Sequence, residues 1–346
     1  MNILYNCDDS YVQHMAVSAA SVFAHNREAK EIRVYLLGKD ISLENRGRLM
    51  ALARQYGRQI TILPLSQFET KVRSLAGEAA DAGRFTMTAF ARLFAAELLP
   101  ESVGRLLYLD CDTVVAGSLQ ALWETDLQGC AAAMAMEPTI YPEARANCGL
   151  SETMPYCNAG VILMDLNAFR REQLAEQCMA FLKERGGRLP FADQDCLNHA
   201  LRGRVRILPQ QYNFLSNYRY FSYKSLARRV SWFRAQTDET SWNEAKRHPL
   251  IIHFAGDERP WIAGNWNPYR KVYCQMLAET PWQNAPEVQG KRGYLFCYHL
   301  MNLMTAVLPS LRFQISARYW KKQIAPFYQL EDSASAKGRQ GIVGTA

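Results

Sequence analysis

The sequence predicts an α/β fold: one domain with a mostly parallel, Rossmann-like central sheet, followed by a basic helical tail. Three apolar runs, at residues 2–7, 32–37 and 59–65, alternate with segments of helical periodicity, which is typical of a parallel, doubly wound sheet. Hydrophobic residues make up 49% of the 346 residues, so a large core can form. A final stretch, residues 288–330, carries six basic residues and no acidic one, although the net charge of the whole chain is only +7.

Local signals justify the first two helices. Residues 11–25 place apolar side chains at helical spacing, and small residues such as Ala16 and Ala20 allow close contact with a sheet. Ser42 is expected to cap a second helix that runs to Tyr56. Glycine-rich phosphate-binding fingerprints are absent, so bound phosphates would need another source of positive charge, which favours a metal ion.

The most informative segment is a buried strand at residues 105–109 that ends in Asp110-Cys111-Asp112. Ligands of open α/β sheets gather at the carboxyl ends of strands. Two carboxylates this close repel each other unless a cation lies between them, and their oxygens suit Mg²⁺ or Mn²⁺. Taken alone, the motif fits a solvated acidic turn equally well.

Two later segments also combine polar groups with strands or helices. Residues 83–100 are predicted to form a helix with Arg92 on an otherwise apolar face, where arginine usually pairs with a carboxylate or faces an anion. An irregular loop is expected at residues 139–155. Asn158-Ala-Gly160 then precedes an apolar strand, a pattern that also fits an ordinary turn.

Asp193-Gln194-Asp195 opens another predicted helix, after an amphipathic helical segment at residues 169–185. Asp193 could cap this helix, which would leave Gln194 and Asp195 unexplained. His253 lies near the end of a further predicted strand, just before a glycine turn. A histidine in such a strand is usually a satisfied core residue, but this one also lies near a carboxyl end.

The stretch at residues 212–242 is rich in aromatic and basic side chains. It could stack on sugars or bases, or it could form the core of a smaller subdomain. Nucleic acid is not an expected partner, because acidic residues interrupt the basic ones and no nucleic-acid-binding motif is present. The nine cysteines show no metal-ligand spacing and the amino terminus no signal peptide, so we expect reduced thiols and a cytoplasmic location.

The tail contains 15 mainly apolar residues, 294–308, fewer than the roughly 20 that span a bilayer. His299, Asn302 and Thr305 are three apart and form one polar stripe on a helix. We expect a cationic, amphipathic helix on an anionic membrane surface, with a helix docked on the domain as the alternative. Residues 331–346 are expected to be disordered.

These segments together resemble glycosyltransferase family 8, which includes bacterial lipopolysaccharide galactosyl- and glucosyltransferases and the glycogenins. The resemblance covers about residues 1–280, and its parts follow the family's order. The matching segments are Asn6-Cys-Asp8-Asp9-Ser10-Tyr11, Phe90-Ala-Arg92-Leu, Leu107-Tyr-Leu-Asp110-Cys-Asp112, Asn158-Ala-Gly160, Asp193-Gln194-Asp195 and His253-Phe-Ala-Gly256-Asp-Glu-Arg259-Pro-Trp261.

The resemblance implies a GT-A catalytic domain over residues 1–280, and the membrane-surface helical tail predicted above follows at 281–330. It implies a retaining hexosyltransferase that moves galactose or glucose from UDP-galactose or UDP-glucose to a cell-surface or lipid-linked saccharide. The expected cofactor is Mn²⁺, with Mg²⁺ as the alternative, and the expected location is the inner face of the cell membrane. The choice between galactose and glucose and the identity of the acceptor stay open.

By position, the resemblance also implies site roles. The metal would be bound by Asp110, Asp112 and His253, the uridine by Asn6, Asp8 and Tyr11, and the sugar by Arg92, Asn158 and Asp193. The pyrophosphate would be bound by Gly256 and Arg259, and Cys111 would also contact the donor. Glu137 would contact the acceptor, and Gln194 would take the catalytic position beneath the anomeric carbon, with Asp193 beside it.

Two residues depart from the family pattern. Arg259 stands where the family usually has lysine, which keeps the charge but changes its geometry to a planar fork. Glu137 stands where close bacterial relatives have a shorter acid. Retention could follow a double displacement or a front-face route, and we favour the second because a neutral amide is a poor nucleophile. The rival functions are a metal-dependent nucleotidyltransferase and a non-catalytic, membrane-surface protein that binds sugar nucleotides.

Overall fold

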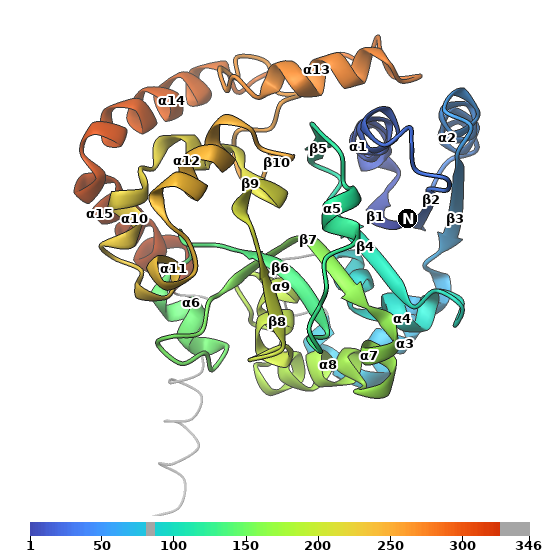
Figure 1. The fold of residues 1–346 in the computed structure, drawn as a ribbon, viewed down its shortest axis with the longest axis horizontal. Helices are drawn as coiled ribbons and strands as arrows, with labels where there is room; N and C mark the ends of the chain where they lie inside the picture. The colour runs from blue at the N-terminus through green and yellow to red at the C-terminus, as the bar shows by residue number, and fades with distance from the viewer. Residues whose placement is uncertain (81–86, 326–346) are drawn as a thin grey trace, which may run out of the picture.

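A mostly parallel sheet forms the centre of the molecule, as predicted (Figure 1). The computed structural model describes residues 1–80 and 87–325, so the predicted disorder of 331–346 lies outside the described residues. Within the described part the sheet has seven strands in the order β3-β2-β1-β4-β7-β6-β8. They are β1 (Asn2–Asp8), β2 (Arg33–Lys39), β3 (Gln59–Pro64), β4 (Arg105–Leu109), β6 (Ala132–Met136), β7 (Cys157–Asp165) and β8 (Val205–Leu208).

Neighbouring strands run parallel except around β7, which pairs antiparallel with both β4 and β6. The strands therefore deliver their functional residues from two directions. Asp8 and Asp110 come at the carboxyl ends of the parallel strands β1 and β4. The Asn158-Ala-Gly160 segment enters β7 at its amino end, which lies beside the carboxyl end of β4 because the two strands are antiparallel.

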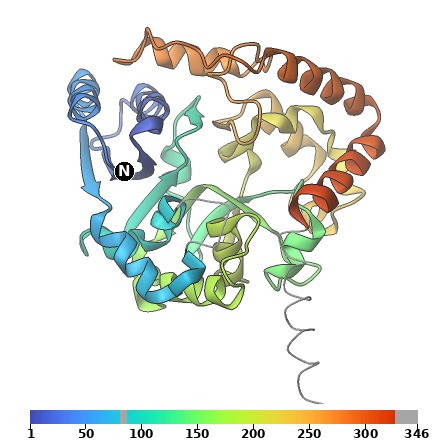
Figure 2. The same ribbon diagram turned by 180° about the vertical axis from the view of Figure 1, so that it is seen from behind.

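Helices cover both faces of the sheet (Figures 1 and 2). Side chains alternate along β1, so Ile3 and Tyr5 share a core with α1 and α2, whereas Leu4 shares one with α3, α8 and α9. The helices are α1 (Val12–His25), α2 (Leu43–Gln55), α3 (Ser66–Ala76), α4 (Ala95–Leu98), α5 (Gln120–Trp123), α6 (Pro142–Asn147), α7 (Leu166–Arg171), α8 (Leu174–Glu184), α9 (Ala192–Ala200), α10 (Tyr223–Ala227), α11 (Ser231–Gln236), α12 (Glu239–Arg247), α13 (Arg270–Ala278), α14 (Arg292–Val307) and α15 (Pro309–Tyr319).

A small second sheet lies beside the first and consists of β5 (Thr113–Val115), β10 (Ile251–His253) and β9 (Phe214–Leu215), in the order β5-β10-β9. The predicted strand at residues 250–254 thus exists, but it belongs to this sheet. Strand β10 pairs antiparallel with β5 and places His253 opposite Thr113. Because Thr113 directly follows Asp112, this pairing joins two motifs that lie 140 residues apart in the chain.

Several predicted element boundaries were wrong. The segment around Arg92 is a 3₁₀ helix, η3 (Met87–Phe94), followed by α4. Residues 139–155 include helix α6, which begins at a proline, a favourable first helical residue. The segment at 169–185 is divided between α7 and α8, because Gln173 takes a left-handed conformation with φ of 53°.

The aromatic stretch at residues 212–242 forms a buried core cluster, which supports the subdomain interpretation over an exposed stacking surface. Phe214, Tyr218, Phe233 and Trp242 are each fully buried in this cluster. Edge-on and tilted ring contacts join them, with centroids 5.4–5.9 Å apart.

The tail forms α14 and α15, which run along one edge of the molecule and then turn down its side (Figure 2). The predicted polar stripe is real, but it faces the protein: His299, Asn302 and Thr305 are at most 2% exposed. The alternative prediction, a helix docked on the domain, is therefore correct for this polar stripe. Among residues 1–80 and 87–325, no helix has both the length and the apolar character needed to cross a bilayer.

Candidate active site

Asp110, Asp112 and His253 meet at the carboxyl end of β4. Each offers one ligand atom, and these atoms lie within 4.8 Å of one another. The His253 Nε2 atom is 3.2 Å from Asp112 Oδ1 and 3.5 Å from Asp110 Oδ2. Two carboxylates and one imidazole this close together suit a divalent cation that accepts oxygen and nitrogen ligands.

A neighbouring amide orients the His253 ring for such a role. Asn213 Oδ1 lies 3.0 Å from His253 Nδ1, and only a protonated Nδ1 can donate to it. The other nitrogen, Nε2, then keeps its lone pair toward the two aspartates. Burial lowers the pKa of His253, which favours the neutral form that binds metals.

Gly160 leaves space for the side chains of His253 and Asp110. A Cβ atom there would lie 2.2 Å from His253 Cε1 and 2.9 Å from Asp110 Oδ2. The Gly160 carbonyl also accepts a hydrogen bond from the Asp110 backbone N–H at 2.8 Å. Asn158-Ala-Gly160 is thus part of strand β7 and not an ordinary turn, and its glycine is required by a close approach of backbone to side chains.

Arg92 lies between Asp110 and Asp193. Its guanidinium lies 2.9 Å from Asp110 Oδ1 and 2.9 Å from Asp193 Oδ2. It also donates to the Ala159 carbonyl at 2.7 Å and stacks over the Tyr108 ring at 4.3 Å. Of the two sequence alternatives for Arg92, the structure thus shows the pairing with carboxylates.

Asp193 does not cap its helix. The residue at the cap position of α9 is Phe191, and Asp193 lies within the first turn with its carboxylate directed at Arg92. Burial raises the pKa of Asp193 to about 6, and Arg92 opposes this shift. Asp193 is 6% exposed, so its interaction with Arg92 is a buried one.

Gln194 is held at both ends of its amide. Its Oε1 accepts from the Ala159 backbone N–H at 3.0 Å, and its Nε2 donates to Glu137 Oε2 at 2.9 Å and to Tyr156 Oη at 3.1 Å. Asn158 Nδ2 donates to the same Glu137 oxygen at 2.9 Å. Glu137 is thus bonded to two of the residues expected to surround the sugar.

Asp195 has a structural position. Its Oδ1 accepts from the Tyr156 hydroxyl at 2.6 Å and its Oδ2 from the Phe191 backbone N–H at 2.9 Å, and the residue is fully buried. Burial raises the pKa of Asp195 to about 6, and the Tyr156 hydroxyl opposes this shift. Asp195 therefore braces the start of α9 behind Gln194.

Asn6 and Cys111 lie next to the metal-site acids. The Tyr108 hydroxyl lies 2.5 Å from Asn6 Oδ1 and 2.7 Å from Asp110 Oδ1, so one hydroxyl links the two residues. Asn6 Nδ2 donates to the Thr88 carbonyl, and the Cys111 thiol lies 3.5 Å from the Asn6 carbonyl.

Arg259 extends the site toward the amino-terminal helices. Its guanidinium forms an ion pair with Asp112 and lies over the Trp261 ring at 5.6 Å. Tyr11 meets the same Trp261 ring edge-on at 5.9 Å and is 37% exposed. Gly256, three residues before Arg259, has a φ of 87°, which suits glycine.

Asp8 is the least connected of the expected uridine residues. It stays exposed at the end of β1, and its Oδ1 accepts from the backbone N–H of Ser10 at 3.0 Å and from the hydroxyl of Ser10 at 2.6 Å. The structure thus leaves the Asp8 carboxylate open to a ligand.

Sequence reasoning missed Tyr108 and Asn213. Tyr108 stands two residues before Asp110, so the period of two along a strand indicates that both side chains point the same way. Asn213 Nδ2 donates to Asn158 Oδ1 at 2.8 Å and its Oδ1 lies 3.0 Å from His253 Nδ1, so it connects the Asn158 amide with His253. Its position in an aromatic stretch gave no signal of this role.

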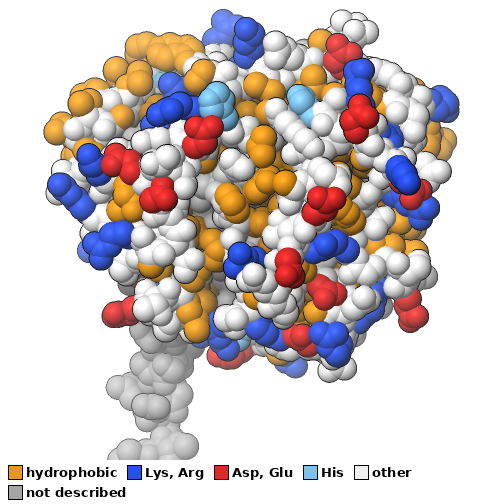
Figure 3. Space-filling model, in the orientation of Figure 1, with side chains coloured by type: hydrophobic (Ala, Val, Ile, Leu, Met, Phe, Trp, Pro, Cys, Tyr) orange, Lys and Arg blue, Asp and Glu red, His pale blue; other side chains and the backbone are white. Residues whose placement is uncertain are grey.

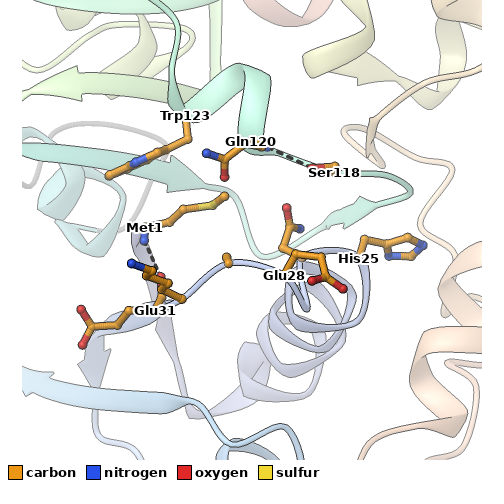
Figure 4. Close-up of a pocket in the computed structure, with 10 residues that line it drawn as sticks. Met1, His25, Glu28, Glu31, Ser118, Gln120 and Trp123 are labelled. Atoms are coloured by element: carbon orange, nitrogen blue, oxygen red, sulfur yellow. Dashed lines mark hydrogen bonds between the residues drawn. The ribbon is translucent and has the colours of Figure 1, made fainter.

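A cavity of about 680 Å³ lies away from this group of residues (Figure 4). It is lined by Met1 at the amino end of β1, by His25 at the end of α1 and by Trp123 on α5. None of the candidate site residues described above lines this cavity. The candidate site is therefore defined by the side chains at the opposite, carboxyl end of β1 and β4.

Comparison with known proteins gives a family and a fold. The model of "Glycosyl transferase family 8" matches residues 2–264. General stress protein A of Bacillus subtilis is 26% identical over 290 residues, which cover 82% of this chain and 94% of that protein. Lipopolysaccharide 1,2-glucosyltransferase of Escherichia coli K12 is 27% identical over 290 residues, covering 82% of this chain and 79% of that protein.

Lipopolysaccharide 1,3-galactosyltransferase of Salmonella typhimurium is 24% identical over 292 residues, covering 82% of this chain and 80% of that protein. A solved structure of the galactosyltransferase LgtC with donor and acceptor sugar analogues has a TM-score of 0.67 and 24% identity, covering 81% of this chain and 96% of that chain. This likeness confirms the predicted GT-A-type fold. Because the family model matches most of the chain, the protein belongs to glycosyl transferase family 8 and is a glycosyltransferase.

Proposed function

We propose that this protein transfers galactose or glucose from a UDP-sugar to a saccharide acceptor, with retention of the anomeric configuration and with Mn²⁺ as cofactor. The observation that carries the proposal is the convergence of Asp110, Asp112 and His253 at the carboxyl end of β4, within a chain of this family. Mg²⁺ is the alternative ion, but a set that includes an imidazole favours Mn²⁺ over a purely oxygen-seeking cation.

These three residues would hold the ion, and Arg259 would add a second positive group toward the diphosphate of the donor. A bound divalent cation supplies Lewis-acid stabilisation of the negative charge that develops on the leaving UDP. Arg259, which already pairs with Asp112, would face the same charge, and its planar guanidinium suits two phosphate oxygens. Gly256 would let the backbone come close to the diphosphate.

The sugar would lie against Arg92, Asn158 and Asp193, with Gln194 beneath the anomeric carbon. Asn6, Asp8 and Tyr11 would hold the uridine, and Cys111 would line the donor site. The contacts of Glu137 with Gln194 and Asn158 support a place for Glu137 at the border between donor sugar and acceptor.

The clamped amide of Gln194 supports the front-face route. Its Oε1, the atom that would have to attack, already accepts a hydrogen bond from Ala159. In the front-face route the bond from the anomeric carbon to the phosphate oxygen breaks, the bond to the acceptor oxygen forms on the same face, and the leaving phosphate takes the acceptor's proton. No enzyme group then has to become a nucleophile.

The acceptor is proposed to be a lipid-linked or cell-surface saccharide. Two of the similar proteins are named as lipopolysaccharide glycosyltransferases, one for glucose and one for galactose, so the names leave the donor sugar open. The family membership favours glycosyl transfer over nucleotidyl transfer and over binding without catalysis.

We also propose that α14 and α15 lie on an anionic membrane surface at the inner face of the cell membrane. Of the thirteen large hydrophobic side chains exposed in the described part of the chain, nine lie between Tyr294 and Tyr319. Hydrophobic side chains gather over the edge that α14 forms (Figure 3). Arg318 in the last turn of α15, and Lys321 and Lys322 in the π-helical turn that follows (Trp320–Ile324), add the charge that anionic headgroups attract.

Asp110→Asn and Asp112→Asn should each abolish Mn²⁺-dependent hydrolysis of a UDP-sugar, because each removes a charged ligand of the proposed metal. The test measures release of free UDP from UDP-galactose and UDP-glucose, with and without a chelator. Turnover that survives the chelator would contradict the metal role. Release of pyrophosphate from UTP and a sugar 1-phosphate, with no UDP released from either UDP-sugar, would indicate nucleotidyl transfer.

Gly160→Ala should weaken Mn²⁺ binding at least about tenfold, because the new methyl group displaces His253 or Asp110. The same overpacking should lower the free energy of unfolding by about 1–3 kcal/mol. Isothermal titration with Mn²⁺ and thermal melting measure the two effects. Gly47→Ala is the matched control, since a Cβ there meets nothing within 4 Å, and unaltered Mn²⁺ affinity in the Gly160 variant would refute the geometry.

Intact-protein mass spectrometry during turnover should detect no covalent sugar adduct, as the front-face route requires. The experiment uses the wild-type enzyme with UDP-galactose or UDP-glucose, with and without an acceptor sugar. A glycosyl adduct mapped to Asp193 or Gln194 would establish double displacement instead.

Replacing Leu303 and Val307 together by serine should weaken binding to vesicles of phosphatidylcholine and phosphatidylglycerol at least about tenfold, because two exposed apolar anchors are lost. Co-sedimentation measures the binding, and UDP-sugar hydrolysis in the absence of vesicles should stay unchanged. Leu43→Ser, at an 89% exposed position on α2, is the matched control. Equal vesicle binding by both variants would exclude the proposed surface.

A further inference from the structure

The buried side of α14 reaches the loop that carries Arg259. His299 on α14 and Glu258 in the loop are each 1% exposed, and His299 Nδ1 lies 3.2 Å from Glu258 Oε1. Glu258 directly precedes Arg259 in the chain. A histidine of the tail therefore contacts the neighbour of the proposed diphosphate-binding arginine.

The hydrogen bonds assign the proton of His299. Its Nε2 accepts from the Trp266 backbone N–H at 3.0 Å, so the ring proton of the neutral form is on Nδ1, which lies 3.2 Å from Tyr220 Oη and 3.2 Å from Glu258 Oε1. The Tyr220 hydroxyl donates to the same Glu258 oxygen at 2.8 Å, and Asn267 Nδ2 donates to the other. Both oxygens of the buried Glu258 carboxylate are thus bonded.

The backbone around Arg259 is fixed by the same part of the structure. The Arg259 carbonyl accepts from Asn265 Nδ2 at 2.9 Å and from the Ile262 N–H at 3.1 Å. Gly264, next in this turn, has a φ of 87° and lies against Arg292 at the start of α14, where a Cβ would be 3.1 Å from Arg292 Cγ. Helix α14 therefore contacts the Arg259 turn at both His299 and Arg292.

Burying the Glu258 carboxylate to hold α14 in place costs free energy of desolvation. Removing a charged group from water costs several kcal/mol unless its partners are well placed, and apolar contacts would dock α14 without that cost. What the polar contacts add is a fixed direction, because each hydrogen bond restricts both distance and angle. The side chain that gains most from a fixed backbone at this point is Arg259.

We propose that Glu258 and His299 are positioning residues for the donor diphosphate, acting through Arg259. The inference rests on the proposed function, since it assumes that Arg259 meets the diphosphate of a UDP-sugar. The tail then contributes to donor binding through its buried side, independently of the membrane contact proposed for its outer side.

The test measures UDP affinity by isothermal titration in the presence of Mn²⁺, with the full-length chain. His299→Ala and Glu258→Ala should each weaken UDP binding about tenfold, and the KM for the UDP-sugar should rise more than kcat falls. His299→Asn, which keeps a donor near Nδ1, should recover much of the affinity. Asn302→Ala is the matched control, because Asn302 belongs to the same buried stripe but bonds to Arg312 at 2.6 Å and not to Glu258.

A double-mutant cycle with Arg259→Ala separates positioning from general destabilisation. If His299 acts through Arg259, His299→Ala should cause little further loss of UDP affinity once Arg259 is removed. Equal losses with and without Arg259, or a His299 effect no larger than that of Asn302→Ala, would overturn the proposal. Failure of the wild-type protein to bind UDP at all would instead refute the proposed function.

Discussion

The pairing of β10 with β5 is the constraint on which the site depends. Asp110 and Asp112 are two residues apart in the chain, and any chain with this motif brings them close together. The third residue of the group, His253, lies beside these two aspartates only because β10 runs antiparallel to β5, with His253 opposite Thr113. A shift of one residue in this register would turn the imidazole to the other face of the small sheet. The backbone N–H of Phe254 donates to the Asp112 carbonyl at 2.9 Å, and this hydrogen bond fixes the register next to His253 and Asp112.

Charge balance explains how so many acids share one small volume. Asp110 and Asp193 flank Arg92, while Asp112 pairs with Arg259. Burial is the largest influence on Asp110 and opposes its ionisation, but Arg92 and the other neighbouring groups outweigh it and the pKa of Asp110 is lowered. Three carboxylates are therefore offset by only two guanidinium groups. The remaining negative charge would attract the proposed divalent cation.

The sequence predicted those parts of the fold and site that depend on short-range patterns. The parallel strands, the Ser42 cap and the acidic pair after β4 follow from periodicity and capping rules, and the Ser42 hydroxyl does accept from the Asn45 N–H. Contacts across the chain were out of reach of such rules. Asn213 orients His253 from 40 residues away, and nothing in its neighbours indicates this. The close approach that requires Gly160 likewise depends on a histidine 93 residues later.

Helix α14 shows why spacing alone leaves the orientation of a helix undecided. The interval of three between His299, Asn302 and Thr305 predicts a stripe, and a polar stripe on a soluble protein normally faces water. Here the stripe has partners inside the protein, since Glu258 and the Trp266 N–H bond to His299 and Arg312 bonds to Asn302. The apolar side chains must then point outward, because the polar positions occupy the inner face. Specific buried partners for the polar side and an exposed apolar side are thus two consequences of one packing arrangement, which is why we assign donor positioning and surface attachment to opposite faces of the same helix.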